Sequence, residues 1–136
     1  LGVVISVESL EKHTLYTVLN SRFLGLGHRE RVIVAYLAAS HEALFQANLM
    51  DYANHGPITL ADIELIKKLA PLLQIAHSLD RSRAGVVTHL KAELGSGTCE
   101  LKIFGTEKRD LEVGDAKRRA GEFEKEYGVK LVVTSA

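Results

Sequence analysis

The spacing of apolar residues changes at Gly85, and that change limits the folds open to this chain. Before Gly85, apolar residues recur at three- and four-residue steps, which is typical of helices with one buried face. After it, Val86–Leu94 and Thr98–Phe104 alternate as half-buried strands do, and Gly95-Ser96-Gly97 between them favours a hairpin turn. The pattern therefore predicts an α+β chain, with helices first and a small sheet second.

The first part is predicted to be a bundle of three main helices. The apolar spacing places these helices at Val7–Leu19, His28–Phe45 and Thr59–Leu79. Thr59 and Asp62 have the spacing of a helix N-terminal cap, and Pro71 is expected to bend the third helix without ending it. A loop is predicted at Asp51–Pro57, where residues typical of turns gather.

The second part is predicted to be a small β-β-α-β subdomain. A charged helix over Leu111–Tyr127 and a strand over Val129–Thr134 follow the hairpin. Three strands need that helix on one face of the sheet to be stable. We expect residues 1–84 to form the helical part and residues 85–136 the subdomain, together as one compact unit.

Charge and cysteine content exclude several classes of protein. Lysine plus arginine and aspartate plus glutamate both total 17, so the chain lacks the positive excess of a nucleic-acid-binding protein. Cys99 is the only cysteine, which rules out an internal disulfide and favours the cytoplasm; we interpret Cys99 as a buried strand residue. The apolar start meets charged residues too soon for a signal peptide or a membrane span, and without an initiating Met it is expected to be the interior of a longer protein.

Two residues suggest a metal site. His77 and Asp80 lie three residues apart on the third predicted helix, so both can project from one face. His13 and His41 could complete a cluster if the three helices pack with these faces together. The plainer interpretation is that His77 is simply packed or solvated, because two ligands do not make a metal site.

Several basic residues are candidates for binding an extended anion. Gly25-x-Gly27 precedes a predicted helix that begins with His28 and Arg29, and backbone N–H groups there could meet a phosphate, although a plain turn is favoured. Arg81 and Arg83 add positive charge at the end of the third helix. Lys117-Arg118-Arg119, by contrast, is surrounded by acidic residues and is interpreted as an exposed helix surface.

Three segments together resemble the exopolyphosphatase/guanosine pentaphosphate phosphatase (Ppx/GppA) family in its C-terminal region. They are Lys12-His13-Thr14-Leu15-Tyr16 leading to Asn20-Ser21, then Gly27-His28-Arg29-Glu30-Arg31 through Ser40-His41, and lastly Lys68-Leu69-Ala70 through Leu79-Asp80-Arg81-Ser82. Their order and spacing agree with the family, and the β-β-α-β tail is similar to its ending. The chain departs from the family at Glu42 and Ala43, where Arg-Lys is usual, and at His77, where an acidic residue is usual.

This resemblance implies a non-catalytic piece of a phosphohydrolase. In the family, an N-terminal domain of the actin-like ATPase type cleaves terminal phosphate from inorganic polyphosphate or pppGpp with magnesium, and the C-terminal helices are HD-like. The chain would then shape the polyphosphate channel and contact a second copy in a homodimer. His28, Arg29, Arg81 and Arg83 would supply polyanion contacts, and the chain alone would be inactive and hold no cofactor.

Two alternatives remain open at this point. The helices could form an HD-type phosphohydrolase that uses its own metal ion, with His77 and Asp80 among the ligands. The chain could also be a dimerisation or regulatory module that binds no ligand. Neither nucleic acid nor a membrane is expected as a partner under any of these interpretations.

Overall fold

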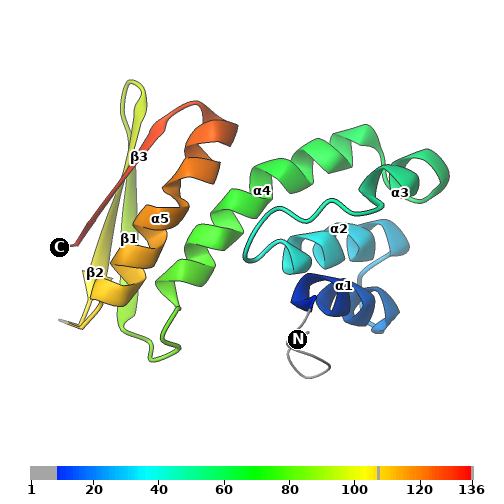
Figure 1. Cartoon of the computed structure of the whole chain (residues 1–136), viewed down its shortest axis with the longest axis horizontal. Helices are drawn as coiled ribbons and strands as arrows, with labels where there is room; N and C mark the ends of the chain where they lie inside the picture. The colour runs from blue at the N-terminus through cyan, green and yellow to red at the C-terminus, as the bar shows by residue number, and fades with distance from the viewer. Residues whose placement is uncertain (1–8, 107, 136) are drawn as a thin grey trace. The chain divides into compact units, whose positions relative to one another are not determined.

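The predicted α+β class is confirmed by a computed structural model, which describes residues 9–106 and 108–135. Within these ranges the elements are α1 (Leu10–Asn20), α2 (His28–Ala39), α3 (Leu49–His55), α4 (Leu60–Leu79), β1 (Val87–Leu94), β2 (Thr98–Gly105), α5 (Asp110–Tyr127) and β3 (Lys130–Ser135) (Figure 1). Helices come first and a β-β-α-β tail follows, as the sequence predicts. Val7, where the first helix was expected to begin, lies outside the described residues.

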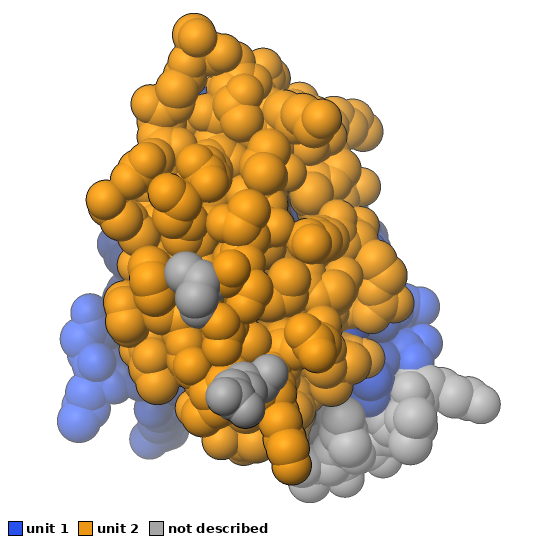
Figure 2. All heavy atoms as spheres, turned by 90° about the vertical axis from the view of Figure 1, so that its left-hand side faces the viewer, with its two compact units in different colours: residues 1–70 blue, residues 71–136 orange. Residues whose placement is uncertain are grey.

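The chain divides into two compact units, Leu1–Ala70 and Pro71–Ala136, which Figure 2 draws in different colours. The dividing point lies inside α4, which continues through Pro71 as the sequence predicts. Proline has no N–H to donate, so the helical hydrogen bond to the carbonyl of Lys67 is not made there. The boundary expected between residues 84 and 85, and the joining of both parts into one compact body, stay predictions.

Tyr36 lies at the centre of the first unit. Its side chain is fully buried, its hydroxyl donates to the carbonyl of Ala47 at 2.7 Å, and burial raises its pKa to about 12. Its ring stacks on Phe45 at 6.2 Å between centroids and meets the edge of Tyr52 at 5.9 Å. The buried apolar side chains around it are Val32, Leu49, Ile58, Ile63 and Ile66.

Helix α2 ends at Ala39, so the prediction that it reaches Phe45 is wrong. Ser40 is buried, and its hydroxyl donates to the carbonyl of Tyr36 at 2.7 Å. The same oxygen accepts the backbone N–H of Phe45 at 3.0 Å. Because a serine side chain can satisfy backbone groups in this way, it competes with further helical hydrogen bonds and the chain turns.

The loop predicted over Asp51–Pro57 is also wrong, because α3 occupies most of this segment. Leu49 is buried in the first unit's core, and this packing anchors the first turn of a helix only seven residues long. The helix ends at His55, and the N–H of the next residue, Gly56, donates to the carbonyl of Tyr52 at 3.0 Å. The turn-forming residues therefore mark the end of a helix rather than a loop.

The second unit contains a three-stranded sheet in the order β1-β2-β3. β1 and β2 are antiparallel, with Leu94 opposite Cys99 across the predicted Gly95-Ser96-Gly97 turn. Gly97 has φ +79°, a left-handed conformation that glycine adopts without strain. β3 runs parallel to β2, and α5 makes the crossover between these strands.

One face of this sheet packs on α5 and on the C-terminal half of α4 (Figure 1). The buried side chains that meet there are Ile75, Leu79, Cys99, Leu101, Ile103, Val113, Ala116, Ala120, Phe123, Leu131 and Val133. The interpretation of Cys99 as a buried strand residue is confirmed. No described helix has both the length and the apolar character needed to cross a bilayer.

Truncating Ile66 tests the first unit's core. Ile66→Ala removes a fully buried side chain and is expected to lower the free energy of unfolding by about 2–5 kcal/mol. Leu65, its neighbour on α4, is 42% exposed, so Leu65→Ala is expected to cost less than about 1 kcal/mol. Urea denaturation followed by circular dichroism measures both values, and equal losses would contradict this assignment of the core.

Candidate functional site

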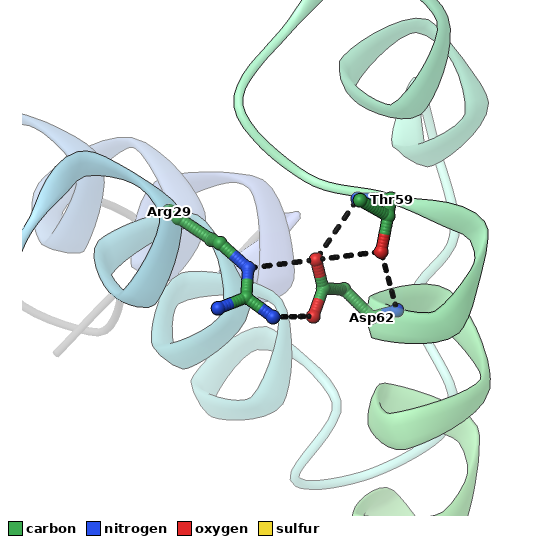
Figure 3. Close-up of polar contacts among 3 residues, drawn as sticks. All are labelled: Arg29, Thr59 and Asp62. Atoms are coloured by element: carbon green, nitrogen blue, oxygen red, sulfur yellow. Dashed lines mark hydrogen bonds and ion pairs between the residues drawn. The ribbon is translucent and has the colours of Figure 1, made fainter.

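Arg29, one of the predicted anion-binding residues, forms a bidentate ion pair with Asp62 in the first unit (Figure 3). Arg29 lies in the first turn of α2, and Asp62 in the first turn of α4. Arg29 Nε donates to Asp62 Oδ2 at 3.0 Å, and Arg29 Nη2 donates to Asp62 Oδ1 at 2.6 Å. This fork geometry is the strongest form of charge-assisted hydrogen bond between side chains.

Asp62 also caps the start of α4, which confirms the predicted capping pattern. The backbone N–H of Thr59 donates to Asp62 Oδ2 at 2.9 Å, and the Thr59 hydroxyl donates to the same oxygen at 3.1 Å (Figure 3). The Asp62 side chain is only 3% exposed. Hydrogen bonds from Arg29, followed by those from Thr59, lower the pKa of Asp62 to about 2.

The Arg29 guanidinium keeps part of its binding capacity. Its side chain is 54% exposed, and its Nη1 makes no contact with the residues drawn in Figure 3. Because a guanidinium carries five N–H donors, Arg29 can bind Asp62 and still offer hydrogens to an anion. Its charge is nevertheless balanced by a neighbouring carboxylate, so any contact with an anion there is weak.

His28 is exposed beside Arg29 at the start of α2. It lines an open pocket of about 260 Å³ together with Asp51, Tyr52, His55, Gly56 and Pro57. The helix start is close to a negative charge, because a Cβ added at Gly27 would lie 2.5 Å from the Glu30 carboxylate. This nearby negative charge favours the interpretation of Gly25-x-Gly27 as a plain turn rather than as a phosphate-binding site.

Arg81 and Arg83 belong to the second unit and lie exposed in the turn after α4. Between them, the N–H of Ser82 donates to Glu112 Oε1 at 3.0 Å, which fixes this turn to the first turn of α5. Hydrogen bonding from Ser82 lowers the pKa of the buried Glu112 carboxyl. Arg83 has φ +55°, a conformation in which few non-glycine residues are found.

Asp115 is the second buried carboxylate of this region. Burial alone would raise its pKa, but a hydrogen bond from Ser78 and the charges of Arg118, Arg119 and Arg81 lower it. Asp115 pairs with Arg118 three residues on, and its Oδ2 lies 3.6 Å from Arg119 Nε. The buried Asp115 carboxylate is thus compensated by the positive charges of nearby arginines.

Burial of Glu112 and Asp115 corrects the sequence interpretation, which placed Lys117-Arg118-Arg119 and the acidic residues around it on an exposed helix surface. Glu112 and Asp115 are both at most 3% exposed, and Arg119 is half-buried with its side chain 16% exposed, whereas Lys117 and Arg118 are exposed as expected. The sequence signal for their burial was their position on the helix. Glu112 lies four residues before the buried Ala116, and Asp115 directly precedes Ala116. From sequence alone, acidic residues beside a buried stripe are assigned to the surface, because the hydrogen-bond donors that would allow their burial are not known.

In the described part of the chain, the predicted metal pair is not completed by a third ligand. α4 ends at Leu79, so Asp80 lies one residue beyond it and is exposed, while His77 is half-buried on the last turn. His13 and His41 belong to the other unit. Among residues 9–106 and 108–135, no three histidine, cysteine, aspartate or glutamate side chains form a group that fits a metal ion.

The Asp62 carboxylate is expected to make folding sensitive to acid. Because its pKa in the folded chain is about 2, below its ordinary value of 3.8, it stabilises the fold above about pH 4 and less so as the pH falls to about 2. Asp62→Asn is expected to lower the melting temperature at pH 7 by several degrees and to flatten the change between these pH values. Thermal unfolding by circular dichroism across this range measures both effects.

Glu64→Gln is the matched control for this experiment. It removes an exposed carboxylate of the same helix, which pairs with Lys67 at 2.9 Å and is 60% exposed. Exposed pairs of this kind contribute little to stability, so the melting temperature should hardly change. An acid profile of Asp62→Asn identical to that of the unaltered chain would contradict the role given to Asp62.

Comparison with known proteins identifies the family. Residues 1–113 match the family model described as Ppx/GppA phosphatase, domain III. Comparison with curated proteins gave no match. The matched range includes all three segments on which the resemblance rests, and it extends into the first turn of α5. This chain therefore belongs to the Ppx/GppA phosphatase family and corresponds to its domain III.

Proposed function

We propose that this chain is the C-terminal, non-catalytic part of an exopolyphosphatase or pppGpp phosphohydrolase. Its match to domain III of the family over residues 1–113 is the observation that carries the proposal. In the intact enzyme, a separate actin-like domain would cleave the phosphate. This chain would line the path along which a long polyphosphate reaches that domain, and it would take part in a homodimer contact.

The exposed basic side chains are the proposed polyanion contacts. His28 and Arg29 would act from the first unit, and Arg81 and Arg83 from the second. All four lie at helix ends or in turns, where long side chains can reach a flexible anion. Exposed ion pairs are each worth about 0.2–1 kcal/mol, so these contacts would guide a long chain of phosphates without binding it tightly.

Magnesium would belong to the catalytic domain in this proposal. The described residues offer no group of three suitable ligands, and His77 with Asp80 supplies two at most. The contribution of this chain would be to substrate binding, which affects KM for long substrates more than kcat.

Neutralising three of the four basic residues tests the proposal in the full-length enzyme. The variant His28→Gln/Arg81→Gln/Arg83→Asn keeps Arg29, because losing Arg29 would unpair Asp62. Asparagine is chosen at position 83 because it tolerates positive φ. Loss of these contacts is expected to raise KM for long polyphosphate about tenfold, with kcat and KM for short substrates unchanged.

The control removes the same formal charge from a surface outside the proposed path. Lys117→Gln/Lys125→Gln neutralises two exposed lysines of α5, matching the two arginines of the test variant. Its KM for long polyphosphate should equal that of the unaltered enzyme. An unchanged KM in the test variant, or an equal rise in the control, would refute a specific polyanion path.

A further inference from the structure

β1 is an edge strand of the second unit's sheet. Among the described residues it pairs only with β2, so its other side carries backbone N–H and C=O groups that no strand satisfies. A register shift between Val87 and His89 disturbs its start, whereas Leu90–Leu94 pairs regularly with β2. Leu90–Leu94 is therefore a regular segment to which another strand can be added.

Leucines of this segment are exposed on the face of the sheet that also carries the core. Leu90 is 50% exposed and Leu94 is 78% exposed, although Leu101 on β2 is buried on the same face. An apolar cavity of about 240 Å³ lies beside Leu90 and Ala92 and is also lined by Leu72. Apolar side chains on an unpaired strand edge are a recognised association surface.

On the opposite face of the segment, the charged residues have residues of the same charge directly opposite them on β2. Lys91 lies opposite Lys102 of β2, and Glu93 lies opposite Glu100. Like charges in directly opposed positions are unfavourable. Lys91 and Glu93 instead pair with each other along the strand at 2.6 Å, and their side chains remain 64% and 47% exposed. On the side of β1 away from β2, no strand of the described residues lies opposite Lys91 and Glu93.

A second copy of β1 supplies that complement in one register. If two β1 strands pair antiparallel about a two-fold axis at Ala92, Lys91 faces the partner's Glu93, and Leu90 faces the partner's Leu94. An axis at Lys91 or at Glu93 instead places identical charges opposite each other. The charge pattern therefore favours one self-complementary register and disfavours its neighbours.

We propose that two copies of this chain associate through their β1 edges in this register, joining their sheets into one of six strands. The inference deepens the homodimer contact of the proposed function by naming its surface, and it makes no use of polyphosphate. Each dimer then contains two Lys91–Glu93 pairs between subunits and two Leu90–Leu94 contacts. A peptide or another protein added to the same edge would lack this symmetric match.

Charge exchange tests the register directly. Lys91→Glu and Glu93→Lys each place like charges opposite each other in the dimer, so each is expected to weaken self-association at least tenfold. The double variant Lys91→Glu/Glu93→Lys restores opposite charges and is expected to recover the affinity to within about threefold. Sedimentation velocity of the 136-residue chain without polyphosphate measures all three. Amide hydrogen exchange should show protection in β1 that increases with protein concentration.

Controls separate this contact from general charge effects and from misfolding. Lys67→Glu and Glu64→Lys change another exposed Lys–Glu pair, on α4, and should leave association unaltered. Circular dichroism verifies that each variant is folded. The β1 contact would be overturned if the chain stayed monomeric. It would also be overturned if neither Lys91→Glu nor Glu93→Lys changed the affinity of the dimer. The KM experiment above uses substrate, so its outcome is independent of this one.

Discussion

Helix α4 contributes buried side chains to two separate cores within one continuous helix. Ile63 and Ile66 in its first half pack in the core around Tyr36, while Ile75 and Leu79 in its second half pack against the sheet unit's core. A 20-residue helix has little freedom to shift along its axis once both sets are buried. The dividing point between the units coincides with Pro71, where one backbone hydrogen bond is already missing.

Buried carboxylates connect segments that are distant in sequence. Asp62 joins the starts of α4 and α2 through Arg29, and Glu112 joins the start of α5 to the turn after α4 through Ser82. Each is held by hydrogen-bond donors, which is what makes a buried charge tolerable. These acids serve to position helix ends.

Local sequence signals explain how much of this could be predicted. The hairpin at Gly95-Ser96-Gly97, the helix through Pro71 and the Thr59–Asp62 cap all depend on neighbouring residues, and all three were predicted correctly. The end of α2 depends on the hydrogen bonds of one buried serine, and α3 on the burial of Leu49, so periodicity missed both. The partners Arg29 and Asp62 are 33 residues apart, a pairing that only the folded chain reveals.

The mixed pairing of the sheet has a consequence for the order in which the second unit assembles. β1 and β2 are joined by a three-residue turn, and hairpins of this kind form within microseconds. β3 is parallel to β2 and reaches it only after the 18-residue helix α5 has crossed the sheet. Closing such a long connection costs entropy before the β2–β3 contacts form. The β1–β2 hairpin therefore forms before the complete sheet, and β3 is the last strand to join.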